Sequence, residues 1–260
     1  MNFDNPAPRL TLGYELDAWK MYREKVPISI DLSPKINSHM LLCGMSGSGK
    51  SYLENQILAK LALAEPDGEV FFGDYKQDDA FAYLRGCPRY YGYKDTLQAL
   101  DTVHSRLLAR QSGEDTSRNP VTLIWDEYMA QILELINSDK LNKKSASAAT
   151  AMNHVGEALM LGRSLGPIRL VTSCQRPDAL AFPAGSRLNY GVVVVLGAAV
   201  RSIYEMLLPD HMEQVKGRQF GRGEGVALFQ GSELHFIKVS AVSNPHRMEE
   251  ICIKALGGKK

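Results

Sequence analysis

Short runs of consecutive apolar residues alternate along the chain with segments whose apolar residues recur every three or four positions. The apolar runs predict buried strands, because a strand covered on both faces needs no polar alternation. These runs are Met40–Cys43, Val70–Gly73, Val121–Trp125, Leu170–Ser173 and Val192–Leu196. The periodic segments predict helices at Ser51–Ala64, Asp95–Gln111, Glu127–Ile136, Ala148–Ser164 and Arg201–Leu208. The alternation predicts an α/β fold, with a mainly parallel sheet and helices on both of its faces.

Two flanking regions predict β extensions of that sheet. Leu10–Leu12 and Ile28–Leu32 predict a hairpin ahead of the first core strand. Gly225–Gln230 and Leu234–Ser240 flank Gly231-Ser232, which is a strong signal for two strands joined by a tight turn. We therefore expect an N-terminal extension over residues 1–36, a core domain over residues 37–241 and a C-terminal tail over residues 242–260.

Composition and charge narrow the class of protein. The formal net charge is +1, so no global basic field indicates a nucleic-acid binder, although a channel needs only local positive charge. The four cysteines are scattered and form no C-x-x-C pair, which predicts reduced thiols in the cytoplasm rather than a metal or disulfide framework. The longest apolar run, Gly191–Val200, is far shorter than the roughly 20 residues of a membrane helix. We expect a cytoplasmic chain without a transmembrane segment, and its recruitment to a membrane by a partner stays open.

The segment Gly44–Ser51, with the sequence GMSGSGKS, matches the phosphate-binding pattern G-x-x-x-x-G-K-[ST]. It lies between a predicted strand and a predicted helix, which is the context that this P-loop requires. Its glycines let backbone N–H groups surround phosphate oxygens, and the helix N-terminus favours the same anion. Lys50 would reach the β- and γ-phosphates of ATP, and the Ser51 hydroxyl would ligate Mg²⁺. The expected nucleotide-binding residues are Gly44, Ser46, Gly47, Ser48, Gly49, Lys50 and Ser51; the alternative is a flexible Gly/Ser turn.

Two carboxylates, Asp126 and Glu127, follow the predicted strand Val121–Trp125. Ligands of parallel sheets bind at the carboxyl ends of the strands, so both side chains are expected beside the P-loop. Asp126 would hold Mg²⁺ directly or through water, and Glu127 would orient and polarise the attacking water. The alternative is an ordinary helix start, where acidic residues are favourable.

Polar residues also end two other predicted strands. Gln175 follows Leu170–Ser173 and could bond the γ-phosphate or the attacking water, or simply cap the strand. Asp74 and Lys76 follow Val70–Gly73 and could form either an exposed ion pair or part of the nucleotide site.

These segments, in this order, resemble the FtsK/SpoIIIE family of DNA translocases, within the wider HerA-like P-loop ATPases. The most specific similarity is an arginine-bearing helix end followed by a strand that closes in Gln-Arg-Pro. The sequence departs from the family pattern at Tyr75, where the family has proline. The similar segments are Ile28–Leu32, His39–Ser51, Gly73–Lys76, Leu123–Tyr128, Gly162–Ile168, Thr172–Pro177 and Gly221–Ala227.

The resemblance implies a RecA-like fold, a homohexameric ring, and double-stranded DNA threaded through its centre. It implies that nucleotides lie at subunit interfaces, and Arg163 matches the position of an arginine finger that would neutralise charge on the transferred phosphoryl group. The alternative is an arginine that is simply favourable near a helix C-terminus. Lys140, Lys143 and Lys144 lie where the family has a basic pore loop, and would contact DNA phosphates without reading bases. The alternative is a solvated charged loop.

The sequence therefore predicts an Mg²⁺-dependent ATPase that moves double-stranded DNA, in a compact form associated with conjugation or mobile elements. Its catalytic residues would be Lys50, Glu127, Gln175 and Arg163. A membrane channel or a relaxase is an expected further partner. Two other functions stay open, namely a type VII-like ATPase for protein secretion and a nucleotide-gated scaffold for a relaxase or replication protein.

Overall fold

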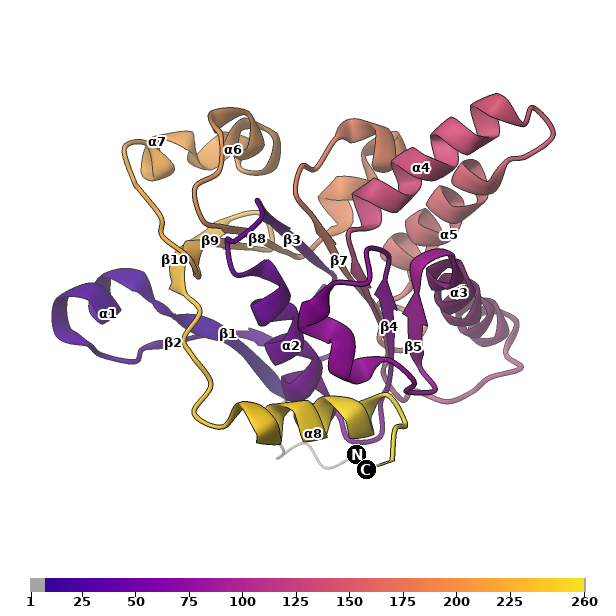
Figure 1. The fold of residues 1–260 in the computed structure, drawn as a ribbon, viewed down its shortest axis with the longest axis horizontal. Helices are drawn as coiled ribbons and strands as arrows, with labels where there is room; N and C mark the ends of the chain where they lie inside the picture. Colours follow the sequence, from indigo (N-terminus) through magenta and orange to yellow (C-terminus); the bar gives the residue numbers. More distant parts are fainter. Residues whose placement is uncertain (1–7, 260) are drawn as a thin grey trace.

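The sheet of the computed structural model, which describes residues 8–259, runs through the whole molecule (Figure 1). Its ten strands within those residues lie in the order β2-β1-β10-β9-β8-β3-β7-β6-β4-β5. The strands are β1 (Arg9–Glu15), β2 (Pro27–Asp31), β3 (Met40–Gly44), β4 (Glu69–Asp74), β5 (Tyr90–Gly92), β6 (Val121–Asp126), β7 (Ile168–Cys174), β8 (Val192–Leu196), β9 (Glu224–Phe229) and β10 (Glu233–Lys238). The six strands from β8 to β5 pair in parallel. The other four continue the sheet in antiparallel pairing.

Helices cover both faces of the parallel part, as the apolar runs predict. They are α1 (Leu16–Tyr22), α2 (Lys50–Ala64), α3 (Thr96–Ser112), α4 (Tyr128–Leu141), α5 (Ser147–Leu161), α6 (Arg201–Leu207), α7 (Met212–Val215) and α8 (Pro245–Ala255). Short 3₁₀ helices are η1 (Asp79–Leu84), η2 (Tyr93–Asp95), η3 (Ala179–Ala181), η4 (Pro183–Asn189) and η5 (Pro209–His211). On β3, Leu42 packs in the core under α2 and α8, whereas Leu41 packs in the core under α3, α4 and α5. Neighbouring residues of each strand thus enter different cores, which explains the uninterrupted apolar runs.

The two predicted β extensions form one structure. β1 and β2 pair as the expected hairpin, and β9 and β10 pair as the expected second hairpin. β1 then pairs with β10, with Tyr14 opposite Lys238, so both ends of the chain build a single antiparallel wing. The first residues of the expected N-terminal extension, 1–7, lie outside the described residues, and the domain boundaries stay predictions.

Three local features differ from the sequence prediction. Helix α1 lies inside the N-terminal hairpin and was not predicted, because its seven residues are too short to show a helical period. Strand β5 has only three residues and was missed for the same reason. Helix α4 continues to Leu141, so Lys140 lies in its last turn and not in the following loop. Within residues 8–259, no helix combines the length and the apolar content needed to cross a membrane.

Candidate nucleotide-binding site

The P-loop joins the carboxyl end of β3 to the amino end of α2. Gly47 and Gly49 have φ angles of +80° and +99°, which are strained for any residue with a side chain. A Cβ atom on Gly44 would lie 2.4 Å from the Ser48 hydroxyl oxygen. The backbone conformation thus favours glycine at Gly47 and Gly49, and a side chain at Gly44 would crowd Ser48.

Acidic and hydroxyl groups surround the Lys50 side chain. Its Nζ atom donates to Asp126 Oδ1 at 2.6 Å and to Ser173 Oγ at 3.0 Å. The carboxylates of Glu127 and Glu54 lie 3.5 and 3.8 Å from the same nitrogen. Burial lowers the pKa of Lys50, but the neighbouring carboxyl groups more than offset this effect and hold the pKa above its ordinary value. The lysine is therefore a fixed positive charge at the point where the P-loop binds phosphate.

Ser173, near the end of β7, connects the P-loop lysine to the strand that bears the two carboxylates. Its hydroxyl donates to Asp126 Oδ1 at 2.8 Å and accepts from the Glu127 backbone N–H at 3.1 Å. With the bond from Lys50, every hydrogen-bonding position of this hydroxyl is used. Ser173 therefore fixes the relative positions of β3–α2 and β6.

Glu127 has a left-handed backbone conformation, with φ of 54° and ψ of 38°, directly before α4. A non-glycine residue in this region is uncommon and carries a cost of about 1–3 kcal/mol. Its side chain makes no capping bond to the helix, which disfavours the alternative of an ordinary helix start. Instead, Glu127 Oε1 accepts from Gln175 at 3.1 Å and lies 3.2 Å from Lys76 Nζ. The turn thus directs a buried carboxylate toward the P-loop side of the sheet.

Glu54, one helical turn after Lys50, is fully buried. Neither of its carboxyl oxygens has a hydrogen-bond partner among the residues that the structure describes. Burial raises the pKa of Glu54 well above its usual range, although the charge of Lys50 opposes this shift. Asp126 and Glu127 lie nearer to the Lys50 nitrogen than Glu54 does, so they face most of its charge.

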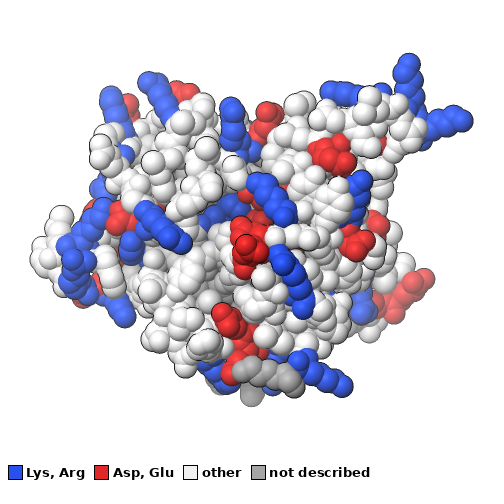
Figure 2. Space-filling model, in the orientation of Figure 1, with Lys and Arg blue, Asp and Glu red and all other residues white. Residues whose placement is uncertain are grey.

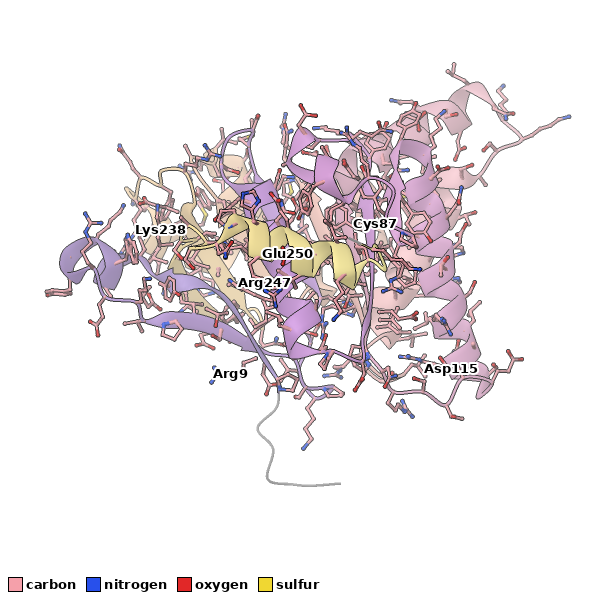
Figure 3. The ribbon with its side chains drawn as sticks, turned by 60° about the horizontal axis from the view of Figure 1, so that its bottom comes forward. Arg9, Cys87, Asp115, Lys238, Arg247 and Glu250 are labelled. Atoms are coloured by element: carbon pink, nitrogen blue, oxygen red, sulfur yellow. The ribbon has the colours of Figure 1, made fainter. Side chains whose placement is uncertain are left out.

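A cavity of about 580 Å³ opens in front of the P-loop, a size suited to a nucleotide. Lys76, Glu127 and Gln175 lie at its lining together with the whole P-loop. Beyond Tyr52 and Asn55 on α2, the lining continues to the first turns of α8. Figure 3 shows α8, marked by Arg247 and Glu250, lying across α2. Helix α8 in the C-terminal tail is thus a wall of the cavity.

The residues present fit ATP with Mg²⁺. The Ser51 hydroxyl lines the cavity, and Asp126 lies 2.6 Å from Lys50. These are hard oxygen donors, the kind that Mg²⁺ takes alongside phosphate oxygens. The buried Ser48 hydroxyl has no hydrogen-bond partner within the described chain. Since buried polar groups are normally hydrogen-bonded, this hydroxyl is available to bind a ligand.

Two groups of predicted residues lie apart from this cavity. Arg163 is exposed in the turn between α5 and β7, at the amino ends of the strands and therefore opposite the P-loop.

Lys140, Lys143 and Lys144 lie at the tip of the α4–α5 hairpin, where Figure 2 shows basic side chains that project from the molecule. Asp139 accepts a bond from the Ala148 N–H at 2.8 Å, which ties the two sides of this tip together. The roles of Arg163 and of the three lysines stay predictions.

Asp74 and Lys76 do not form the ion pair that was one of their two expected roles. Asp74 is buried and accepts a bond from the Tyr90 hydroxyl at 2.8 Å. Lys76 instead pairs with Glu127 at the cavity.

Three residues of this site were not assigned roles from the sequence, or only in part. Ser173 and Glu54 were missed, and Lys76 was left undecided between two roles. A signal for the first two did exist. Ser173 is a polar residue in an apolar strand two positions before Gln175, and Glu54 follows Lys50 by four residues on the buried side of α2.

Comparison with known proteins agrees with this geometry. Residues 20–78, which contain the P-loop, match the family model described as the central domain of the helicase HerA. No curated protein matches the chain.

Solved structures match almost the whole chain. The cytoplasmic domain of the type VII secretion ATPase EccC from Thermomonospora curvata is 20% identical, with a TM-score of 0.63 over 96% of this chain and 31% of that chain. The pCW3 conjugation coupling protein TcpA with ATPγS is 19% identical, with a TM-score of 0.70 over 96% of this chain and 71% of that chain. EssC (ATPases 2 and 3) from Geobacillus thermodenitrificans is 13% identical, with a TM-score of 0.64 over 97% of this chain and 49% of that chain.

The chain thus spans about a third of the EccC structure and about half of the EssC structure. At these identities the likeness concerns the fold. The predicted RecA-like α/β architecture and the resemblance to HerA/FtsK-type P-loop ATPases are both confirmed.

Proposed function

Starting from a HerA/FtsK-type P-loop fold, we propose that this chain is an Mg²⁺-dependent ATPase that uses hydrolysis to move double-stranded DNA. One observation carries the ATPase part. Lys50 of the P-loop lies 2.6 Å from Asp126 and 3.5 Å from Glu127, although 76 residues separate it from Asp126. Such a cluster of one lysine and two carboxylates beside an open anion-binding loop is suited to phosphoryl transfer.

Each residue has a distinct role in this proposal. Lys50 exchanges its bonds to Asp126 and Ser173 for bonds to phosphate oxygens. Ser51 and Asp126 would hold Mg²⁺, which would supply charge neutralisation to the phosphates of the nucleotide. Glu127 orients and polarises the attacking water, and Gln175, 3.1 Å from its carboxylate, links that water to β7.

The Lys76 ion pair holds the Glu127 side chain in place before the nucleotide binds. Because phosphoryl transfer to water needs positioning and charge neutralisation more than covalent chemistry, these groups are sufficient.

The DNA part of the proposal rests on the basic tip of the α4–α5 hairpin. α4 begins directly after Glu127, so the helix that carries Lys140 starts at the residue proposed to activate water. A shift of this turn during hydrolysis would move the tip, where Lys143 and Lys144 contact DNA phosphates. In a homohexameric ring, six such tips would line the central passage, and Arg163 would act on the nucleotide of a neighbouring subunit. The ring works in the cytoplasm, and a membrane channel or a relaxase is its further partner.

The test is the rate of ATP hydrolysis with and without duplex DNA, measured across protein concentration. We expect stimulation by DNA and a steep concentration dependence, because the active site is shared between subunits. Lys50→Ala should abolish turnover, whereas Lys94→Ala, at an exposed position outside the cavity, should retain it. Full turnover in Lys50→Ala would contradict the proposed site.

The lysine tip is tested separately by converting Lys140, Lys143 and Lys144 to Gln. DNA binding should weaken and its dependence on log[salt] should become shallower by about 1 for each lost phosphate contact. A control variant carries the same change at the exposed Lys35, Lys94 and Lys216. If DNA binding weakened equally in both variants, the lysines at the tip of the α4–α5 hairpin would not be the proposed DNA contact.

A secretion ATPase is the second candidate, because the EccC and EssC structures match 96% and 97% of the chain. Stimulation of turnover by a secreted polypeptide, and not by duplex DNA, would select it. Tight ATP binding with negligible turnover at every protein concentration would instead select the nucleotide-gated scaffold.

A further inference from the structure

Three cationic side chains line the cavity, and they differ in their partners. Lys50 is paired with Asp126 and Glu127, and Lys76 is paired with Glu127. Arg222, exposed in the turn before β9, has no ion pair or hydrogen bond from its guanidinium among residues 8–259. The cavity therefore contains one cation whose charge is not already balanced by a carboxylate.

The backbone that carries Arg222 is fixed against the P-loop. The Gly223 N–H donates to the Ser48 carbonyl oxygen at 2.7 Å, and Gly223 has a φ of +69°. On the other side, Lys238 Nζ donates to the Arg222 carbonyl oxygen at 3.2 Å. The turn is closed by the Gly221 N–H, which donates to Glu224 Oε2 at 3.1 Å. The backbone around Arg222 is thus held by hydrogen bonds, whereas its side chain is exposed.

The stem of this arginine lies beside the glycine that precedes the P-loop lysine. A Cβ atom on Gly49 would lie 3.9 Å from Arg222 Cγ and 3.2 Å from the Gly223 nitrogen. The guanidinium at the end of this stem is therefore within reach of the phosphates that the loop surrounds. Its planar array of donors suits two phosphate oxygens at once, which a lysine cannot match.

We propose that Arg222 binds the phosphate chain of the nucleotide held by its own subunit, as a second cation beside Lys50. The proposal rests on the proposed ATP site and adds a residue that lies outside the P-loop motif and outside the two carboxylates. Because Lys76 is already paired with Glu127, Arg222 supplies positive charge to the polyphosphate of ATP in addition to that of Lys50. The turn before β9 is then part of the nucleotide site and links it to the antiparallel wing.

The experiment measures the Kd of Mg-ATP by calorimetry for the wild type, Arg222→Ala and Arg222→Lys. Loss of a charge-assisted bond should weaken binding about tenfold or more in Arg222→Ala, with partial recovery in Arg222→Lys. Arg201→Ala is the matched control, because Arg201 is exposed on α6 and lies outside the cavity lining. It should bind ATP as the wild type does, and all variants should unfold at similar temperatures because the Arg222 side chain holds nothing in place.

The outcomes separate this inference from the proposed function. If Arg222→Ala binds ATP with the wild-type Kd, the inference is wrong while the ATP site stands. If its Kd is unchanged but its turnover falls, Arg222 acts on a neighbouring subunit's nucleotide, which also overturns binding within one subunit. If the wild type binds no ATP, and Lys50→Ala behaves in the same way, the proposed ATP site itself is wrong, and the inference about Arg222 is wrong with it.

Discussion

Two buried ion-pair networks lie at the two ends of α2, and both reach the same strand, β7. At the amino end of the helix, Lys50 meets Ser173 near the end of β7 and Asp126 on β6. At its carboxyl end, Glu65 forms a bidentate ion pair with Arg169 at the beginning of β7. The Arg169 Nη1 and Nη2 atoms lie 2.8 and 3.0 Å from the two carboxylate oxygens of Glu65. The two networks share a helix and a strand, yet they differ in how completely their polar atoms are bonded.

The Arg169 network is closed. Its guanidinium also donates to the hydroxyls of Ser38 and Thr122, at 2.9 and 3.1 Å, so each of its three nitrogens has a partner. The Lys50 network is open, because the Ser48 hydroxyl and both oxygens of Glu54 have no hydrogen-bond partner in the described chain. Buried polar atoms are normally bonded, so a closed network indicates a structural role and an open one indicates a site prepared for a ligand.

The largest expected effect lies at the open network. Glu127→Gln should lower kcat about 10²- to 10⁴-fold, because the amide no longer polarises the attacking water. The unfolding midpoint and the Kd for ATP should stay close to the wild-type values. Kinetics, calorimetry and urea titration measure the three quantities, and Glu134→Gln on the same α4 helix, outside the cavity lining, is the control. If Glu127→Gln lowered the free energy of unfolding as well as kcat, the distinction between an open ligand-binding network and a closed structural network would be wrong.

The next effect concerns the closed network. Arg169→Met should destabilise the fold by about 3–5 kcal/mol, because it leaves the Glu65 carboxylate buried without its partner. The free energy of unfolding comes from urea titration, and the turnover of folded protein should change little. Arg201→Met provides the matched control, since it breaks an exposed Arg–Glu pair worth about 0.5 kcal/mol or less.

A double variant shows whether the cost comes from the unpaired carboxylate. Arg169→Met combined with Glu65→Leu replaces both charges by apolar groups and should recover most of the lost stability. If the double variant is as unstable as Arg169→Met alone, the pairing with Ser38 and Thr122 matters more than the ion pair.

The smallest effect is a change in pH dependence. Because the pKa of Glu54 is raised in the folded protein, the folded state holds more protons than the unfolded state above pH 4.5, the unshifted pKa. This group therefore lowers stability as pH rises from 4.5. Glu54→Gln should remove that loss, so the variant should gain stability relative to the wild type as the pH rises from 5 to 8.

Thermal unfolding across this pH range measures the effect, with Glu213→Gln, at an exposed position on α7, as the control. A variant whose stability curve runs parallel to that of the wild type would show that Glu54 does not titrate in this way.

Much of the parallel core could be predicted from the sequence. Five apolar runs became β3, β4, β6, β7 and β8, with ends that differ from the prediction by at most two residues. The position of Gln175 beside Glu127 also agrees with the reasoning that strand ends meet at one edge of a parallel sheet. Short or isolated elements such as α1 and β5 carry too few residues for a period to be recognised.

The sequence by itself determined the P-loop, the two carboxylates and the alternation of strands and helices, because backbone freedom and side-chain periodicity are local properties. Only the tertiary structure decided that Ser173 holds Lys50 against Asp126, that Glu54 is buried without a hydrogen-bond partner in the described chain, and that Arg222 lines the cavity. It also decided that the two ends of the chain meet in one wing through β1 and β10. These features depend on strand order and on how α2 packs on the sheet, and both are set by contacts between segments far apart in the chain.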